Sequence, residues 1–301
     1  MRPVTALAAQ RARSVSDPAS PRLRRAGGTN QTQRRGDTET RRRAGKCLSV
    51  LVALVVAALT GCSAGRSPAV ATTGPSPIAS SLQVVLVVAG NWDATSAVMH
   101  CYQRKGPTEA WTLVAGPVPV SIGRTGLAWG RGLAGSPPPF AGPVKKEGDG
   151  KAPAGAFELP AAFGYAPAET ARDIHLPYLA LTPNVIGVDD PKSRYYNQIV
   201  DTDLQAKDWD SFETMRRADD LYEWGVLVNH NTSPAQAGAG SCIFMHVWRG
   251  EGKPTAGCTA MSKDQMIKLV KWLDSHAKPV LVQLSKDEYY RLSPTWGLPT
   301  Y

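Results

Sequence analysis

The chain of 301 residues is 43% apolar and 20% charged, which is enough for one large domain or two small ones with a substantial core. Its 28 Gly and 24 Pro residues favour many short elements over a helical bundle. The formal charge of +9 lies entirely in residues 1–61, which hold 12 of the 34 basic residues and three of the 25 acidic ones. Residues 62–301 are therefore neutral overall and lack a basic stripe, so we expect no nucleic-acid partner.

Residues 1–61 are predicted to be an Arg-rich leader that ends in a signal peptide. The apolar run 48–59 is too short for a membrane-spanning helix, which takes about 20 residues, and it follows a basic flank as secretory signals do. The run ends in Leu59-Thr60-Gly61-Cys62, which resembles the lipobox of bacterial lipoproteins. That resemblance implies cleavage before Cys62 and lipidation of its thiol and new amino group; an ordinary signal peptide with a chance cysteine is the alternative.

Residues 62–81 are rich in Ser, Thr, Pro, Ala and Gly and are predicted to form a disordered tether. One domain is expected over 82–285, followed by a C-terminal extension over 286–301. The β-branched run 82–89 predicts a buried strand at the start of the domain. Further strands are expected at 111–115, 118–123, 156–159, 178–182, 225–229, 243–248 and 280–284.

Two helices are expected in this domain. The clearer one covers 263–275, where apolar residues recur at helical spacing and Ser262 forms a capping-box pattern with Gln265. The other is expected near 211–220. With so few helices and so many short strands, the sequence predicts a mainly β domain.

A histidine and a cysteine lie where a strand and a loop can bring them together. Strand 243–248 carries His246, and a loop rich in Gly and Pro leads from it to Cys258. A thiol, whose free pKa is about 8.5, needs a base or a positive field to become a nucleophile, and an imidazole supplies one. Gly257 would let the backbone approach a bound carbonyl, so the amides of Gly257 and Cys258 are candidates for an oxyanion hole.

The same residues have simpler interpretations. Cys258 could be a buried apolar residue or half of a disulfide, and His246 could be a core histidine with its hydrogen bonds satisfied. A zinc site is a further alternative, but no CxxC or HxxH pair accompanies the candidate ligands. Those ligands would be His230, Cys242, His246 and Cys258. We therefore expect no metal and no cofactor.

The stretch 240–262 resembles the active-site segment of the L,D-transpeptidases, the YkuD-type catalytic domain of bacterial cell-wall enzymes. His246 matches the family's first His, while Thr255, Gly257 and Cys258 match its second block. Segments 120–131, 148–157 and 189–197 extend the resemblance, which covers roughly 82–285. It implies a β-sandwich of mixed sheets, catalysis by Cys258 and His246, and a main-chain carbonyl near Val247 that orients the histidine.

Three departures from the family pattern concern the surroundings of the pair. Ala256 replaces a His, Thr259-Ala260 replaces an apolar residue and Asn, and only 11 residues separate His246 from Cys258. These changes bear on substrate contacts and on the acyl acceptor. The candidate substrate contacts are Ser241, Arg249 and His230, and Arg249 could equally be a solvated charge. The polar segment 186–224 is expected to be a lid, or else a loop with a surface helix.

The resemblance places the domain outside the cytoplasm, where disulfides persist. With Cys258 as the nucleophile and Cys62 lipidated, a Cys101–Cys242 bridge is the expected pairing; two free buried thiols are the alternative.

The implied enzyme is a cysteine acyltransferase anchored by its lipid to a bacterial membrane, facing the cell wall, and monomeric. Cys258 would form a thioester with a peptidoglycan stem tetrapeptide, release D-Ala and pass the acyl group to a second stem as a 3→3 crosslink. An L,D-carboxypeptidase or crosslink-cleaving hydrolase would use the same residues with water as the acceptor. A non-catalytic wall-binding lipoprotein is the remaining alternative.

Overall fold

The computed structural model describes residues 75–301 except 136, 137 and 139. The predicted leader, the lipobox with Cys62, and residues 62–74 of the predicted tether lie outside the described residues. The described residues belong to one compact unit. Among them, no helix is both long and apolar enough to cross a membrane.

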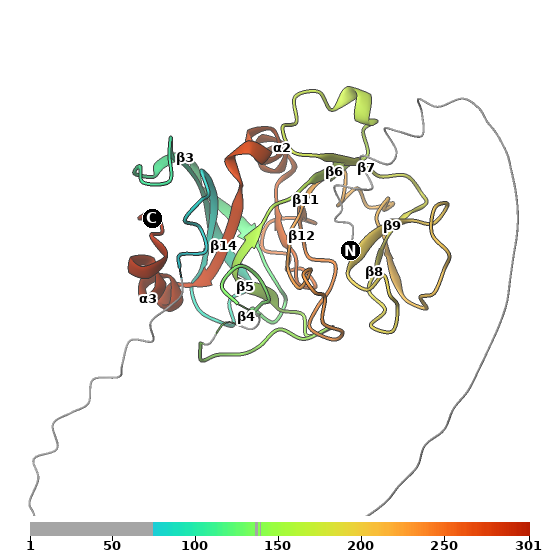
Figure 1. The fold of residues 1–301 in the computed structure, drawn as a ribbon, viewed down its shortest axis with the longest axis horizontal. Helices are drawn as coiled ribbons and strands as arrows, with labels where there is room; N and C mark the ends of the chain where they lie inside the picture. Colours follow the sequence, from blue (N-terminus) through green and yellow to red (C-terminus); the bar gives the residue numbers. More distant parts are fainter. Residues whose placement is uncertain (1–74, 136–137, 139) are drawn as a thin grey trace, which may run out of the picture. The chain divides into compact units, whose positions relative to one another are not determined.

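The strands of the described residues form two sheets (Figure 1). The larger has 11 strands in the order β4-β5-β14-β1-β2-β3-β13-β12-β11-β6-β7 and mixes parallel with antiparallel pairs. Its strands are β1 (Gln83–Ala89), β2 (Ser96–Gln103), β3 (Thr112–Ser121), β4 (Leu127–Trp129), β5 (Ala152–Glu158), β6 (Ala162–Gly164), β7 (Tyr178–Ala180), β11 (Trp224–Leu227), β12 (Phe244–Val247), β13 (Thr259–Met261) and β14 (Val280–Ser285). The smaller sheet is antiparallel, in the order β10-β8-β9, and consists of β8 (Val185–Val188), β9 (Gln198–Asp201) and β10 (Phe212–Thr214).

The main core is built around β1, whose seven residues are all buried. Strand β1 pairs in parallel with β14 and antiparallel with β2, so its backbone is hydrogen-bonded on both edges. Helix α2 (Lys263–Trp272) and helix α3 (Lys286–Trp296) cover this core with apolar faces. The buried helix residues are Met266, Leu269, Val270, Tyr289, Leu292 and Trp296.

A second core lies toward the smaller sheet. It joins apolar residues of β6, β7, β8, β9, β11 and β12 with the turn that follows β10. Its members include Phe163, Leu179, Val185, Ile199, Met215, Tyr222, Leu227, Phe244 and Cys258. On its other face the smaller sheet packs a third, small cluster that includes Ile186, Val188 and Trp209.

The predicted fold class, mainly β with mixed sheets and few helices, is confirmed. The helix expected at 211–220 is wrong, because the short strand β10 and turns occupy that segment. The helix expected at 263–275 ends at Trp272, and Ser262 makes no side-chain capping bond, so the predicted capping box is not formed. The strands expected at 111–115 and 118–123 are one strand, β3.

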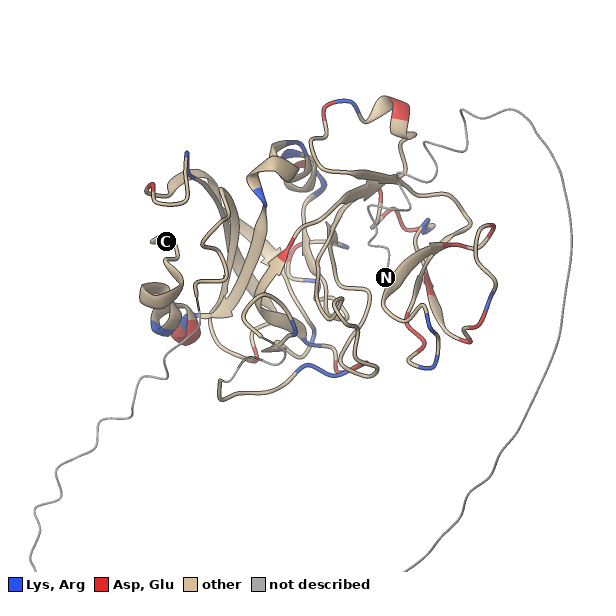
Figure 2. Ribbon diagram, viewed as in Figure 1, with Lys and Arg blue, Asp and Glu red and all other residues tan. Residues whose placement is uncertain are grey.

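Packed residues extend beyond 82–285 at both ends. Ile78 is 1% exposed in the main core, and the Ser76 hydroxyl donates to the Trp296 carbonyl at 2.5 Å. Helix α3 begins at Ser285, whose hydroxyl accepts the Glu288 amide, and ends at Gly297 in the left-handed conformation that glycine favours. Acidic and basic residues are interspersed over the described ribbon, in keeping with its near-neutral charge (Figure 2).

Candidate active site

The pairing of β12 with β13 places His246 and Cys258 on one face of the large sheet. The two strands are parallel, and His246 lies opposite Ala260. Residues directly opposed in a sheet share a face and faces alternate along a strand, so Cys258, two residues before Ala260, lies on the His246 side. Met245 packs in the main core and Phe244 in the second core, so neighbouring residues of β12 face opposite sides of the sheet.

The loop before Cys258 is held by Thr255. The Thr255 hydroxyl donates to the Cys258 carbonyl at 2.7 Å and accepts the Gly257 amide at 3.0 Å. Gly257 has φ +156°, and a Cβ there would lie 3.0 Å from the Lys151 carbonyl, so the turn requires glycine. Because its N–H is bonded to Thr255, Gly257 is not an open oxyanion donor here, contrary to the prediction.

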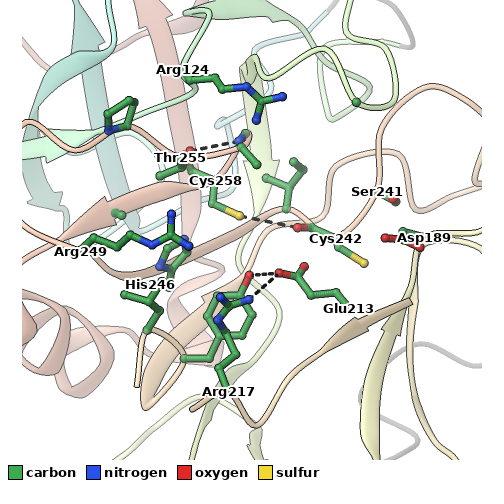
Figure 3. A pocket seen from close by; sticks show the side chains of 18 of the residues that line it. Arg124, Asp189, Glu213, Arg217, Ser241, Cys242, His246, Arg249, Thr255 and Cys258 are labelled. Atoms are coloured by element: carbon green, nitrogen blue, oxygen red, sulfur yellow. Dashed lines mark hydrogen bonds and ion pairs between the residues drawn. The ribbon is translucent and has the colours of Figure 1, made fainter. Parts of the chain in front are cut away.

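A cavity of about 560 Å³ opens beside these residues, and His246 and Cys258 both line it (Figure 3). The wall opposite Thr255 comes from the smaller sheet and its connections, in the segment predicted as a lid. Residues of that wall include Asp189, Phe212, Glu213, Thr214 and Arg217. This segment is therefore a wall built on strands rather than a loop with a surface helix.

Cys258 is a buried, neutral thiol in this arrangement. Its Sγ accepts the Phe244 amide at 3.4 Å and donates to the Cys242 carbonyl at 3.7 Å. Burial raises its pKa to about 12, and the nearby Glu213 carboxylate acts in the same direction. The resting thiol is therefore neutral, so of the two predicted means of activation a base fits this arrangement and a positive field does not.

His246 is held as a neutral base. Its Nδ1 lies 2.7 Å from the Val247 carbonyl, as the family resemblance implies, and a carbonyl only accepts, so Nδ1 carries the proton and Nε2 is the acceptor. The Tyr222 ring packs edge-on against the imidazole at 5.1 Å. Burial lowers the His246 pKa to about 4, with Arg217 adding to the effect. A neutral thiol beside a neutral imidazole fits general-base catalysis better than a preformed ion pair.

No hydrogen bond joins His246 to Cys258 among the described residues, because the thiol is directed at the Cys242 carbonyl instead. Figure 3 shows the Cys242 carbonyl and His246 on different sides of the thiol. Catalytic hydrogen bonds are often long or absent in substrate-free enzymes, so the separation does not count against the pair. A rotation of the thiol is the motion that the geometry requires.

Charged groups on the wall are largely paired with one another. Glu213 accepts the Tyr222 hydroxyl at 2.5 Å and lies 3.6 Å from Arg217. Burial raises the Glu213 pKa against the opposing effects of these two partners. Arg217 also makes two bonds of 2.7 Å to Asp219. Such bidentate pairs are rigid, so this part of the cavity is preorganised.

The predicted substrate contacts have different positions. Ser241 lines the cavity and donates to Glu147 at 2.9 Å. Arg249 also lines it; its side chain is 65% exposed and lies 3.9 Å from Asp219. His230 is fully buried, with Nε2 3.0 Å from the Ala239 carbonyl and Nδ1 accepting the Arg131 amide. Its role as a substrate contact is therefore wrong, because both ring nitrogens hold the chain.

The predicted Cys101–Cys242 disulfide is not formed. Both thiols are free; Cys101 is buried in the main core, whereas Cys242 lies against the second core and lines the cavity. The sequence carried no information about the distance between these two thiols.

The zinc alternative has no geometric support. Within the part of the chain that the structure describes, no three His, Cys, Asp or Glu side chains converge as a metal site.

Several residues of the site were not predicted as functional. Glu147 and Glu213 accept tyrosine hydroxyls at the cavity wall, and Asn197 bonds the loop that carries Cys242. Asn197 lies in segment 189–197, which was noted only as part of the family resemblance. The resemblance in segment 189–197 therefore pointed to Asn197, although the sequence did not show what this residue contacts.

Comparison with known protein families identifies the domain that carries these residues. Residues 92–282 match the family described as the L,D-transpeptidase catalytic domain, YkuD. The match covers more than half of the chain and includes both His246 and Cys258. Searches of curated proteins and of solved structures give no match.

Proposed function

Since the chain belongs to the YkuD family of L,D-transpeptidase catalytic domains, we propose that it is a cysteine acyltransferase that makes 3→3 crosslinks in peptidoglycan. The observation that carries the proposal is the placement of Cys258 and His246 on one face of the sheet, lining one cavity. A neutral thiol and a neutral imidazole have the protonation states with which such a reaction starts.

The reaction begins when Nε2 of His246 accepts the proton of the Cys258 thiol as the sulfur attacks a carbonyl carbon. That carbonyl joins the third residue of a stem tetrapeptide to its terminal D-Ala. The S–C bond forms, the C–N bond breaks, and His246 returns the proton to the leaving amine of D-Ala. An amine of a second stem then attacks the thioester and regenerates the thiol.

Other groups of the cavity bind and orient the stem in this proposal. Arg249 meets a substrate carboxylate at the exposed rim, and Ser241 contacts the stem beside Glu147. Because the Gly257 amide is engaged by Thr255, the Cys258 amide is the remaining candidate of the predicted oxyanion pair. An oxyanion donor is typically worth about 3–4 kcal/mol of transition-state stabilisation.

The test compares products made from purified tetrapeptide stems by the wild type, Cys258→Ala and Cys101→Ala, using mass spectrometry. A 3→3 crosslinked dimer with free D-Ala from wild type and from Cys101→Ala, and none from Cys258→Ala, supports the proposal. Tripeptide and D-Ala without dimer would instead identify the hydrolase. Stem binding without any turnover would identify the wall-binding alternative.

Anchoring through a lipid on Cys62 is a further part of the proposal and rests on the lipobox-like sequence alone. It implies a domain outside the cytoplasm that faces the wall. Cys62→Ser should move the protein from the membrane fraction to the soluble fraction and remove incorporation of a labelled fatty acid. A variant that stays on the membrane without label would contradict this anchoring.

A further inference from the structure

Asn197 connects the smaller sheet to the loop that ends at Cys242. It stands immediately before β9, with φ +59°, a conformation that Asn adopts more readily than most residues. Its Nδ2 donates to the carbonyls of His230 and Asn231 at 2.8 and 2.7 Å. Its Oδ1 accepts the Cys242 amide at 3.0 Å. One side chain therefore bonds both ends of the loop 230–242.

Cys242 is also held from a second direction. Its side chain packs on β8 so closely that a Cβ at Gly187 would lie 2.8 Å from the Cys242 sulfur. Its backbone has φ +53°, an unfavourable conformation for a residue with a side chain, so the surrounding contacts must maintain it. The smaller sheet thus fixes Cys242 through its amide and through its thiol.

The fixed Cys242 in turn contacts the nucleophile. The Cys242 carbonyl accepts the Cys258 thiol at 3.7 Å, on a different side from His246 (Figure 3). A carbonyl oxygen beside the sulfur keeps the proton on it, since a thiolate would face a partial negative charge. The position of this carbonyl therefore decides where the thiol rests before it turns to His246.

We propose that Asn197 is a positioning residue, which fixes the Cys242 carbonyl and through it the resting orientation of the Cys258 thiol. Its effect on turnover rests on the proposed function, whereas its effect on thiol reactivity does not. Without Asn197 the carbonyl is released, and the thiol becomes more reactive toward small electrophiles but less well placed for the stem carbonyl. Reactivity and turnover then change in opposite directions.

The test uses Asn197→Gly, because glycine keeps the left-handed backbone and removes all three side-chain bonds. Lys278→Gly is the matched control, since Lys278 has φ +49° and is an exposed residue at the end of a short 3-10 helix. Alkylation of Cys258 by iodoacetamide is followed by peptide mass spectrometry, and turnover by release of D-Ala. Thermal unfolding of each variant gives the folded fraction.

We expect Asn197→Gly to alkylate about tenfold faster and to turn over about tenfold more slowly, with KM nearly unchanged. A tenfold change corresponds to the net contribution of about one of the three lost hydrogen bonds, the one to the Cys242 amide. Lys278→Gly should match the wild type in both. Asn197→Asp retains the acceptor for the Cys242 amide and should give smaller changes of the same signs. If Asn197→Gly is folded to the same extent as the wild type, then alkylation and turnover that fall together, or that both stay unchanged, would overturn the positioning role.

Gly187→Ala is the second variant should Asn197→Gly fail to fold. It displaces the Cys242 sulfur without removing a hydrogen bond, and it should show the same opposite changes in alkylation and turnover. Unchanged alkylation in this variant would also overturn the proposal. If the wild type makes no product at all, the proposed function fails, while the alkylation rates still decide the role of Asn197.

Discussion

The main core around β1 and the second core around Cys258 both bury apolar side chains, but burial has different consequences in the two. Strand β1 buries seven consecutive residues, six of them apolar, with its backbone paired on both edges. The second core instead encloses or adjoins a thiol, an imidazole, a phenol and a carboxylate. Burial at β1 stabilises the fold at any pH, whereas burial beside Cys258 holds the thiol and the imidazole neutral and raises the pKa of Glu213. The side chains proposed to react, Cys258 and His246, therefore lie beside the second core, where polar groups are buried among the apolar ones.

The largest expected effect is a loss of turnover on substitution of His246, beside the second core. His246→Gln should lower kcat on the order of 10²–10⁴-fold, because the amide cannot take the thiol proton. The unfolding free energy should change little, since no buried charge is removed. Release of D-Ala and urea unfolding measure the two quantities. Retained turnover would show that another group is the base and would break the assignment of chemistry to this core.

A substitution in the main core should instead lower the unfolding free energy and leave turnover unchanged. Leu86→Ala, at a fully buried position of β1, should lower the unfolding free energy by about 2–5 kcal/mol through lost burial and a cavity. Turnover per folded molecule should stay at the wild-type value, measured below the transition temperature. A large fall in kcat of the folded protein would mean that the two cores are coupled.

The difference between the cores also predicts how stability depends on pH. Burial holds the pKa of His246 and of His230 at about 4, whereas both titrate near 6.5 in the unfolded chain. Between these values the unfolded chain binds more protons, so stability is greatest above pH 6.5 and falls as pH drops toward 4. Each histidine contributes on the order of 3 kcal/mol to this loss.

Urea unfolding at several pH values checks this dependence. His246→Gln should remove about half of the loss, and the same substitution at the exposed His276 is the control. Equal slopes for the wild type and His246→Gln would contradict the buried neutral state of this imidazole.

The smallest expected effect is at the rim of the cavity. Arg249→Ala should raise KM for the stem peptide roughly three- to tenfold, the loss of one charge-assisted contact, and leave the unfolding free energy unchanged because the side chain is 65% exposed. Lys268→Ala, on an exposed position of α2, controls for the loss of a positive charge. An unaltered KM would contradict the substrate contact and support the alternative interpretation, in which Arg249 is a solvated charge.

The sequence predicted the elements whose side chains follow a regular pattern. The run that forms β1 and the strand that carries His246 were both predicted, because apolar runs and period-two patterns reflect which side of a strand is buried. Strands of three residues, such as β10 and β13, are too short to show a period, so 211–220 was mistaken for a helix. Helix α3 was missed although its acidic first turn and Gly297 marked its ends.

The other wrong predictions concern how deeply a side chain is buried and how far apart two side chains lie. Neither can be deduced from the identity of a single residue. His230 stands among polar neighbours, as a surface residue would, but the loop turns its ring inward onto two backbone groups. The separation of Cys101 from Cys242 depends on strand order within the sheet. The neutral state of Cys258 likewise depends on the smaller sheet that closes over it, which no motif around the cysteine encodes.

The contact of Ser76 with Trp296 shows on which side of the domain the described chain begins. The chain enters the described fold beside α3, with Ile78 seated in the main core, while the smaller sheet, part of which lines the cavity, lies on the other side of the domain in Figure 1. If the chain is anchored as proposed, the attached side of the domain is the α3 side, and the smaller sheet faces away from it.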